Sequence, residues 1–529
     1  MIITRKNQDI EKKVYLVLII GLIIRTIIAI YLYPGYDEAY YYLYTKYLDW
    51  SYFDHPPLVA LTTGLGIWLT GAVNQFTIRI GTLILHTGSL YLLYLTGKKL
   101  FDAQVGLFTV IIASLIPIFQ IAFGVLTLPD VPLIFFWTLT LYLIAEEFFA
   151  NSGTYQPTYR VAVIGLVVGL ACLSKYHGFI LGLGLVGFCL SNPKYWQVFY
   201  SRWLWLGFLL FLLTMLPLLY WNWQNDWISF TFQLSGRFES SQGLQINLLN
   251  LILFFLVGNL YLFPSLGFPL WWVTGKALFL EIVTRPNYRI QLILWVSLPI
   301  VLGFTLLGAT TQILPTWPMP GFWGLILILG YCVNVWWRRS PQVVKKWLNF
   351  SGLAIQTLFI IALLHISTGL LQNPNQYPLP TGFISPDDDP STELIDVVQL
   401  GSEFNLSTQF REVFADSDFV FTNAYYLGGY IGMALAQNPD MIDMPITCFS
   451  DDVRGFKFWS SMDNLLGKDA LYITTSNFGQ NEELTADLSG YFDTFSKVTE
   501  IPITRAGEVT ELFYVYQGLN LLAMPDFIN

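Results

Sequence analysis

The sequence predicts a polytopic α-helical membrane protein with a small α/β domain at its C-terminal end. Hydrophobic residues make up 54% of the 529 residues and charged residues only 12%, about half the charged share of an average soluble domain. Apolar runs of roughly 17 to 25 residues recur through the first two-thirds of the chain, and each is long enough to cross a hydrocarbon layer about 30 Å thick. Beyond about residue 372 the sequence becomes polar and acidic.

About eleven apolar runs are expected to be transmembrane helices. The first begins after Lys12 and Lys13 and has no small-residue cleavage pattern behind it, so it is expected to be a retained span. The fifth and sixth runs are the shortest. The expected spans lie near residues 14–33, 78–97, 104–122, 129–149, 160–175, 178–191, 203–221, 246–273, 290–310, 320–337 and 348–371.

The basic residues of the loops are distributed unevenly, which predicts the orientation of the chain. With a cytoplasmic N-terminus, one set of loops carries sixteen lysines and arginines, and the opposite set carries only Lys46, Lys175 and Arg237. Cytoplasmic loops of membrane proteins are enriched in lysine and arginine. The N-terminus is therefore expected in the cytoplasm and the C-terminal segment outside it. Most of the acidic residues lie in that segment, the net charge of the whole chain is -9, and no nucleic-acid partner is expected.

The chain is expected to have three parts: a transmembrane domain over residues 1–371, a linker over residues 372–390, and an extracytoplasmic α/β domain over residues 391–529. The linker, QNPNQYPLPTGFISPDDDP, contains prolines and acids that interrupt any helix. After it, segments such as DFVFTNAYYLGGYIGMALA and ELFYVYQGL alternate strand-like and helical patterns.

The first outward loop, residues 34–57, combines nine aromatic residues with several titratable ones. A belt of aromatic side chains at headgroup depth would account for its tyrosines. The belt does not account for the adjacent acids Asp37 and Glu38 directly after the first span, where an ionised carboxylate is costly unless water or a partner receives it. A solvated loop remains the alternative for this pair. Asp54 and His55 close the loop.

Four further polar segments fall on the same predicted face. Asp130 lies between two prolines before the fourth span, where a helix N-cap or a first-turn acid is the alternative. The segment LSKYHG places Lys175 at the outward end of the fifth span, where a lysine that reaches toward the interface is the alternative. The other candidates in these segments are Tyr176, His177, Arg237 and Trp317.

Acids, cations and aromatic rings at one cavity mouth suit the transfer of a sugar from a phosphate carrier. A carboxylate can remove the acceptor proton, cations can stabilise the departing phosphate, and aromatic faces can stack on sugar rings. The predicted catalytic residues are Asp37 and Glu38. The predicted substrate-binding residues are Asp54, His55, Asp130, Lys175, Tyr176, His177, Arg237 and Trp317. No GxGxxG, Walker, HExxH or paired CxxC motif is present. No cofactor is therefore expected, although two acids and a histidine could bind a divalent ion.

Five motifs, in order over about residues 10–340, carry a family resemblance: DEAYYYLY, YFDHPPL, TLPDVPLIFFW, LSKYHG and LPTWPMPGFW. They resemble bacterial members of glycosyltransferase family 39. This family is related to protein O-mannosyltransferases and lipid A aminoarabinose transferases, which have the GT-C membrane fold. The resemblance implies a polyprenyl-phosphate sugar donor such as undecaprenyl phosphate, inversion at the anomeric carbon, metal-independent catalysis and a bacterial-type inner membrane.

The resemblance also implies roles for individual residues. Asp37 matches the acid assigned as the catalytic base, and Glu38 matches its acidic neighbour. Asp54 matches the acid before the Pro-Pro pair, and Asp130 matches the acid of the second outward turn. Aminoarabinose transferases carry lysine immediately before the Pro-Pro pair, where this chain has His55, a residue that is only partly charged near neutral pH.

The predicted function is that of a hexosyl- or pentosyltransferase on the extracytoplasmic face of the membrane. It would move a sugar from polyprenyl phosphate to a hydroxyl or phosphate of an acceptor glycan, lipid or protein, with Asp37 as general base. Lys175, His55 and Arg237 would hold the lipid phosphate. One alternative is a polytopic transporter or lipid flippase with a polar cavity, although no internal repeat is evident. The other is a non-catalytic scaffold or receptor built on the C-terminal domain.

Overall fold

The structure is a computed structural model that describes residues 2–150, 154–236, 247–283, 287–311, 313–373, 382–459 and 462–525. The chain forms two compact units, and each combines segments that are distant in sequence. The first unit contains Met1–Thr26, Trp50–Val59 and Thr82–Leu358. The second contains Ile27–Asp49, Ala60–Gly81 and Phe359–Asn529.

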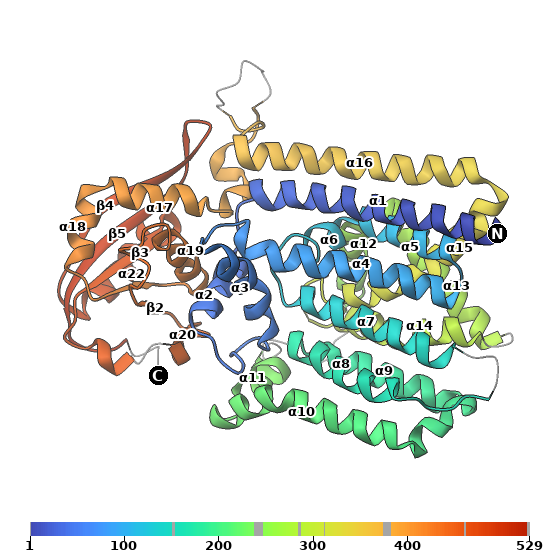
Figure 1. Ribbon diagram of the computed structural model, residues 1–529. Coiled ribbons are helices and arrows are strands. Elements are labelled where there is room, and N and C mark those ends of the chain that lie inside the picture. The colour runs from blue at the N-terminus through green and yellow to red at the C-terminus, as the bar shows by residue number, and fades with distance from the viewer. Residues whose placement is uncertain are drawn as a thin grey trace. The chain divides into compact units, whose positions relative to one another are not determined.

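The first unit is built from helices that pack along one another. In Figure 1, α7, α8 and α10 form one group of neighbours, and α14 contacts both α9 and α15. The helices are α1 (Ile2–Tyr31), α4 (Ile80–Leu100), α5 (Ala103–Leu115), α6 (Pro117–Ile121), α7 (Asp130–Phe148), α8 (Arg160–Ser174), α9 (Gly178–Ser191), η2 (Pro193–Tyr200), α10 (Arg202–Gln224), α11 (Ile228–Thr231), η3 (Phe232–Gly236), α12 (Leu248–Leu262), α13 (Pro264–Val283), α14 (Tyr288–Leu307), α15 (Met319–Arg339) and α16 (Pro341–Thr368). The ends of α1, α4 and α16 extend into the second unit.

The predicted membrane class is confirmed. Within the described ranges, eight helices are long and apolar enough to cross a membrane, and five shorter apolar helices accompany them. The shorter group includes α8 and α9, which correspond to the two shortest predicted spans. The protein is therefore a multi-pass membrane protein.

Two predicted spans are interrupted at prolines. The span near residues 104–122 is divided between α5, which ends at Leu115, and α6, which begins at Pro117. The prediction of one continuous helix over residues 246–273 is wrong, because α12 ends at Leu262 and α13 begins at Pro264. Proline lacks an N–H and clashes with the preceding turn. Phe263 between the two helices has a positive φ of 65°, a conformation that also stops a helix.

The loops predicted to be cytoplasmic meet at one end of the first unit. Lys98 pairs with Glu11 at 2.7 Å, and Lys99 pairs with Glu146 at 3.1 Å. These contacts join the ends of α4 and α7 to the start of α1. A third ion pair at 3.1 Å links Arg338 at the end of α15 to Asp102 before α5. The loops that supplied the lysine and arginine asymmetry are thus neighbours.

The second unit contains a five-stranded mixed sheet. Its strands are β1 (Phe419–Thr422), β2 (Ile446–Cys448), β3 (Ala470–Thr475), β4 (Phe492–Arg505) and β5 (Glu508–Leu521), in the order β2-β1-β3-β5-β4. β1 pairs in parallel with β2 and β3, whereas β5 is antiparallel to β3 and β4 (Figure 1). On one face Phe421 stacks on Tyr472 and Phe492 at centroid distances of 5.0 and 5.7 Å. The predicted C-terminal α/β domain is confirmed.

Helices from both ends of the chain complete the second unit. They are α2 (Tyr36–Lys46), α3 (Leu58–Thr70), η1 (Thr77–Arg79), η4 (Pro386–Asp388), η5 (Pro390–Glu393), α17 (Val397–Leu406), α18 (Thr408–Ala415), α19 (Tyr425–Leu435), α20 (Phe456–Trp459), η6 (Met462–Leu465), α21 (Ser476–Gly479) and α22 (Glu482–Ser489). The compact units therefore differ from the predicted domains, whose boundary was placed at residue 371. The first outward loop contains a helix, because α2 occupies eleven of its residues, and α3 begins directly after it.

Candidate active site

Helix α2 carries the predicted acid pair in its first turn. Its start is favoured because the Glu38 carboxylate accepts a hydrogen bond from the backbone N–H of Gly35 at 3.2 Å. Acids in the first turn and Lys46 in the last turn also complement the helix dipole. The two acids have different surroundings: Asp37 is exposed, whereas Glu38 is 1% exposed. Only Asp37 is therefore accessible to an acceptor from solvent.

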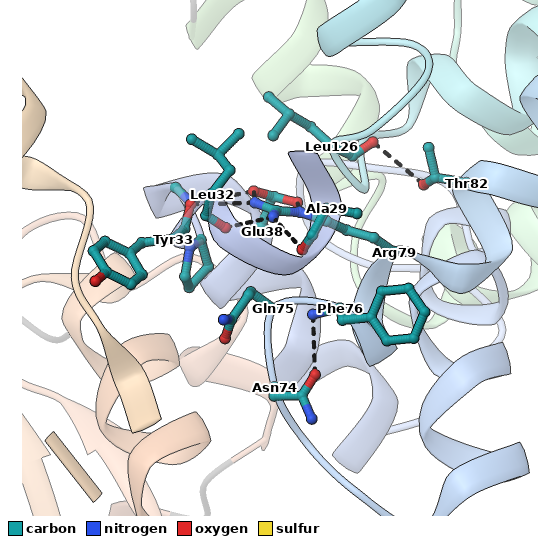
Figure 2. A network of polar contacts seen from close by, with 12 residues as sticks. Ala29, Leu32, Tyr33, Glu38, Asn74, Gln75, Phe76, Arg79, Thr82 and Leu126 are labelled. Carbon is teal, nitrogen blue, oxygen red and sulfur yellow. Dashed lines mark hydrogen bonds and ion pairs between the residues drawn. The ribbon is translucent and has the colours of Figure 1, made fainter. Parts of the chain in front are cut away.

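Glu38 is engaged by Arg79, which stands in η1 just before α4. The Nε and Nη2 atoms of Arg79 donate to the two carboxylate oxygens at 2.8 and 2.6 Å. Its remaining N–H groups donate to the backbone carbonyls of Ala29, Leu32 and Tyr33 at 3.1, 2.6 and 3.2 Å (Figure 2). All five N–H groups of the buried guanidinium thus have acceptors.

The Arg79 contacts fix the turn between α1 and α2. The three carbonyls lie at the C-terminal end of α1, where helical carbonyls lack intrahelical partners and a cation is favourable. The carboxylate of Glu38 holds the start of α2. One guanidinium therefore joins the end of α1 to the start of α2, and it sets the position from which Asp37 extends. Asn74 holds the start of η1, because its side-chain oxygen accepts from the N–H of Phe76 at 3.0 Å (Figure 2). The same oxygen accepts from the N–H of Thr77 at 3.0 Å.

Helix α2 also packs closely against α19 of the second unit. A Cβ atom built on Gly429 would lie 2.3 Å from the carbonyl carbon and oxygen of Ala39, so the two backbones meet where a side chain would not fit. The hydroxyl of Tyr430 donates to the carbonyl of Pro34 at 3.0 Å. At the other end of α2, the ammonium of Lys46 donates to the carbonyl of Ile442 at 2.7 Å. The C-terminal part of the chain therefore holds α2 along its length.

The tyrosines of α2 are core residues instead of an aromatic belt. Tyr40, Tyr41, Tyr42 and Tyr44 are 0 to 3% exposed. The hydroxyl of Tyr40 accepts a hydrogen bond from the N–H of Gly455 at 3.0 Å. Burial against the protein, and not against lipid headgroups, explains why this segment is so rich in aromatic rings.

In the first unit, Lys175 and Asp130 form a buried ion pair. Lys175 Nζ lies 2.9 and 2.8 Å from the two carboxylate oxygens of Asp130, and the residues are 9% and 8% exposed. Asp130 is the first residue of α7, and Lys175 follows the last residue of α8. Asp130 is therefore the first-turn acid that the sequence allowed, and it also pairs with Lys175, which is buried instead of reaching toward the interface.

Lys175 lines a cavity of about 200 Å³ in the first unit. His177 stacks on Phe304 at 4.9 Å, and Phe304 contacts Trp317 edge-on at 5.4 Å, so one wall is aromatic. The side chain of Gln233 donates to the backbone carbonyl of Asp54 at 2.6 Å and closes another side. The other lining residues are His55, Tyr176, Ile180 and Leu234.

The structure groups the predicted site residues as follows. Five predicted binding residues line the cavity of the first unit: His55, Lys175, Tyr176, His177 and Trp317. Asp130 holds Lys175, and Asp54 is buried beside His55. Asp37 and Glu38 belong to the second unit. Arg237 lies outside the described residues. Within the described part of the chain, no group of three or more His, Cys, Asp or Glu side chains is placed to hold a metal ion.

An apolar groove shares one helix, α9, with the cavity. Its volume is about 390 Å³, and it lies between α8, α9 and α10. Along α9, Phe179, Leu183 and Val186 line this groove, whereas His177 and Ile180 at the start of the helix line the cavity. The groove and the cavity therefore lie on different faces of α9 and share no lining residue.

Sequence reasoning missed Arg79 and Gly429. Arg79 stands at the start of an apolar run, and a charge in that position is a usable signal because it must find a partner. Gly429 gives no such signal, since nothing in the segment YYLGGYIG distinguishes a glycine at a helix contact from one in a turn.

Comparisons with known proteins agree with this architecture. Residues 54–221 match the family described as dolichyl-phosphate-mannose-protein mannosyltransferase. The chain is 26% identical over 355 residues to the lipid A galacturonosyltransferase RgtD of Rhizobium johnstonii, which covers 65% of this chain and 68% of that protein. The fold is similar to ArnT from Cupriavidus metallidurans in the apo state, with a TM-score of 0.61 and 14% identity over 95% of this chain and 97% of ArnT. The same enzyme bound to undecaprenyl phosphate gives a TM-score of 0.57 and 13% identity over the same shares of the two chains.

These similarities relate a helical membrane body with a C-terminal sheet to sugar-transferring enzymes. They favour a glycosyltransferase over the alternatives raised from the sequence, which were a transporter, a lipid flippase and a scaffold. The chain is a multi-pass membrane glycosyltransferase with the GT-C fold.

Proposed function

We propose that the chain transfers a sugar from a polyprenyl phosphate to an acceptor hydroxyl on the extracytoplasmic face of a bacterial-type inner membrane. The observation that carries this proposal is that α9 lines a polar cavity, which contains Lys175, and on another face an apolar groove. His177 and Ile180 line the cavity, and Phe179, Leu183 and Val186 line the groove. A polyprenyl phosphate needs both kinds of surface, because a charged head is followed by a long apolar chain.

The phosphate is assigned to the cavity beside Lys175. Asp130 accepts from Lys175 and fixes the direction of its ammonium, which leaves an N–H for a ligand oxygen. His55 and His177 add imidazole groups that can hydrogen-bond to a phosphate oxygen. The dolichyl-phosphate wording of the matching family and the undecaprenyl phosphate bound by ArnT support a donor of this chemistry.

The proposed reaction is a single displacement. The acceptor oxygen forms a bond to the anomeric carbon while the bond from that carbon to the phosphate oxygen breaks, so the configuration inverts and the lipid phosphate leaves with the electron pair. Asp37 accepts the proton of the acceptor hydroxyl. Lys175 and His55 stabilise the charge that develops on the phosphate. Glu38 positions Asp37 through Arg79 and the turn between α1 and α2.

The proposed orientation places the N-terminus in the cytoplasm. The loops with many lysines and arginines meet at one end of the first unit, as the Lys98–Glu11 and Arg338–Asp102 pairs indicate. Such an excess is typical of cytoplasmic loops. Lys175 and Asp130 stand at the opposite ends of α8 and α7, which would face the extracytoplasmic side.

A chain-length experiment tests the donor assignment. Leu183 is 71% exposed and lines the groove, whereas Leu190 is 58% exposed on the same helix and does not. Leu183→Trp is expected to raise the KM for undecaprenyl-phosphate sugars about tenfold, because excluding two CH₂ groups at about 0.8 kcal/mol each costs about 1.6 kcal/mol. Leu190→Trp is the matched control. Equal effects on undecaprenyl and on short farnesyl donors would contradict the groove assignment.

A second experiment tests the base. Purified Asp37→Asn is incubated with a panel of polyprenyl-phosphate sugars, and release of the free lipid phosphate is followed. General-base catalysis contributes about 100- to 10,000-fold, so kcat is expected to fall in that range while donor binding is retained. Asp49→Asn, in the same segment of the chain, is the control. Activity of Asp37→Asn within a few-fold of the wild type would remove this role.

A further inference from the structure

A second cavity lies in the second unit, at the C-terminal end of α2. Its volume is about 380 Å³, within the size range of small-molecule binding sites. The end of α2 contributes Lys46 and Tyr47, the segment before β2 contributes Asp443, and α20 and η6 contribute Trp459 and Asn464. The proposed glycosyltransfer mechanism gives this cavity no role.

Aromatic rings form a preorganised wall of this cavity. Tyr47 and Trp459 stack with a centroid distance of 5.2 Å and an interplanar angle of 8°. Tyr44 and Phe456 contact Trp459 edge-on at 5.6 and 5.3 Å, so the indole is held from several sides. Both Tyr47 and Trp459 remain partly exposed. Rings that are fixed before binding bind a flat apolar surface at little further cost in conformational entropy.

Polar groups of three kinds surround the aromatic wall. Asp443 offers a carboxylate, Asn464 offers an amide, and both side chains are exposed. Lys46 contributes an ammonium that already donates to the carbonyl of Ile442 at 2.7 Å. Burial lowers the pKa of Lys46, and the nearby charge of Asp443 opposes that shift. The cavity therefore presents hydrogen-bond donors and acceptors beside aromatic rings, without a large net charge.

This combination fits a saccharide better than a lipid or a phosphate. A pyranose ring has an apolar C–H face that packs on an aromatic ring and a rim of hydroxyls that require both donors and acceptors. An acyl chain would make no hydrogen bond to Asp443 or Asn464, and a phosphate would be repelled by Asp443.

The cavity and the proposed base share one helix. Asp37 stands in the first turn of α2 and Lys46 in the last turn. Nine residues at about 1.5 Å each separate them by about 14 Å. An oligosaccharide of a few units can span that distance.

We propose that this cavity is a subsite for the acceptor glycan, where Tyr47, Trp459, Asp443 and Asn464 hold a sugar unit distant from the hydroxyl that receives the new residue. This inference rests on the proposed function, because it takes Asp37 to mark the reacting end of the acceptor. The subsite selects acceptors that carry at least a second sugar, and it thereby contributes to specificity and not to the chemical step.

The experiment uses the purified full chain and measures two quantities for each variant. The first is direct binding of oligosaccharide probes, namely chitotetraose, cellotetraose and deacylated lipid A, followed by saturation-transfer NMR. The second is release of lipid phosphate with acceptors of one sugar and of several sugars. The variants are Asp443→Asn, Asn464→Ala and Trp459→Ala, with Asp440→Asn as an exposed control on the same segment.

At least one probe is expected to bind the wild type. Loss of one hydrogen bond in Asp443→Asn or Asn464→Ala is expected to weaken that binding about five- to tenfold, and Trp459→Ala more than tenfold. Transfer to a one-sugar acceptor is expected to stay within twofold of the wild type in the two exposed-residue variants. The proposal is overturned if no probe binds the wild type, if binding is unchanged in all three variants, or if one-sugar and several-sugar acceptors lose activity equally.

The outcome is separable from that of the proposed function. If Asp37→Asn is active, Asp37 is not the general base, but the binding of probes beside Trp459 can still be measured. Conversely, if probe binding is unchanged in the subsite variants, the subsite proposal is wrong. The donor and base experiments are not affected by that result.

Discussion

Gly429 on α19 faces the peptide backbone of Ala39 on α2, and a Cβ atom at Gly429 would lie 2.3 Å from the carbonyl of Ala39. No rotation of a side chain relieves such a contact, because the backbone fixes the positions of both the Cβ atom and the carbonyl. The helix that carries Asp37 is therefore seated on a part of the chain almost 400 residues away, and its position depends on a single missing methyl group.

Gly429→Ala tests this contact. Overpacking a close contact costs about 1–3 kcal/mol, so we expect a lower temperature of thermal unfolding in detergent and a lower kcat, because α2 must shift. Gly275→Ala on α13 is the control, since a Cβ atom there meets nothing within 4 Å. Equal stability of the two variants would show that α19 moves away without consequence.

The Glu38–Arg79 pair is expected to be essential for folding. Removal of one partner from a buried ion pair costs about 3–5 kcal/mol, so Arg79→Ala should reduce the yield of folded protein sharply. Arg79→Lys keeps the charge but loses the planar fork that reaches both Glu38 and the carbonyls of α1, and it should rescue only in part. The exposed pair of Lys497 and Glu500 is the control; Lys497→Ala should cost below about 1 kcal/mol. The measurement is thermal unfolding followed by tryptophan fluorescence.

Lys175→Ala is expected to weaken binding of undecaprenyl phosphate about 10- to 100-fold, because a hydrogen bond to a charged group contributes about 1.5–3 kcal/mol. The effect should appear in KM more than in kcat. Asp130→Asn should weaken binding less, since the ammonium remains but is no longer oriented. Native mass spectrometry of the protein with lipid phosphate provides the measurement, and Lys98→Ala, at the other end of the helices, is the control. A wild-type affinity for Lys175→Ala would place the phosphate elsewhere.

A pH effect is expected from Asp389 in the second unit. This carboxylate accepts from Ser391 and Arg505 and lies 2.9 Å from His365 Nε2. Burial alone would raise the pKa of Asp389, but hydrogen bonds from Ser391 and the charge of Arg505 lower it below its ordinary value.

A carboxyl with a lowered pKa stabilises the folded state above its unfolded pKa of about 3.9, and this stabilisation is lost as pH falls through the folded pKa. The difference in unfolding temperature between the wild type and Asp389→Asn should therefore shrink as pH falls from about 6 to about 3. Asp387→Asn, at an exposed neighbouring position, should show no such trend. A difference that stays constant with pH would mean that Asp389 contributes through packing alone.

Much of the helical body could be predicted because its cause is local. A run such as residues 203–221 is apolar enough that no arrangement other than a span suits it, and α10 (Arg202–Gln224) confirms this. The break between α12 and α13 was missed because Pro264 falls inside an otherwise continuous apolar run. Proline inside a run does not always stop a helix: Pro217 lies within α10, whereas Pro264 begins α13.

The candidate site was predictable in its chemistry and less so in its contacts. Lys175 and Asp130 were chosen separately from their loops, and their pairing followed only from the packing of α7 on α8. Arg79 was overlooked because its partners are mostly backbone carbonyls, which every residue possesses and no sequence pattern marks. The close packing of α2 on α19 depends on Ala39 and Gly429, which are 390 positions apart in the sequence. Composition and periodicity do not predict a contact over that separation.

The seating of α2 also has a consequence for biosynthesis. The hydroxyl of Tyr430 and the carbonyl of Pro34 are 396 residues apart. At about 5–20 residues per second, the ribosome needs roughly 20 to 80 s to make the intervening chain. During that interval the aromatic surface of α2 has been translated but not yet covered, while the Glu38–Arg79 pair, only 41 residues apart, can already form. The nascent protein thus passes through a stage in which the turn between α1 and α2 has formed but α19 does not yet bury the aromatic surface of α2. Chaperones or the insertion machinery would be expected to bind that surface during this stage.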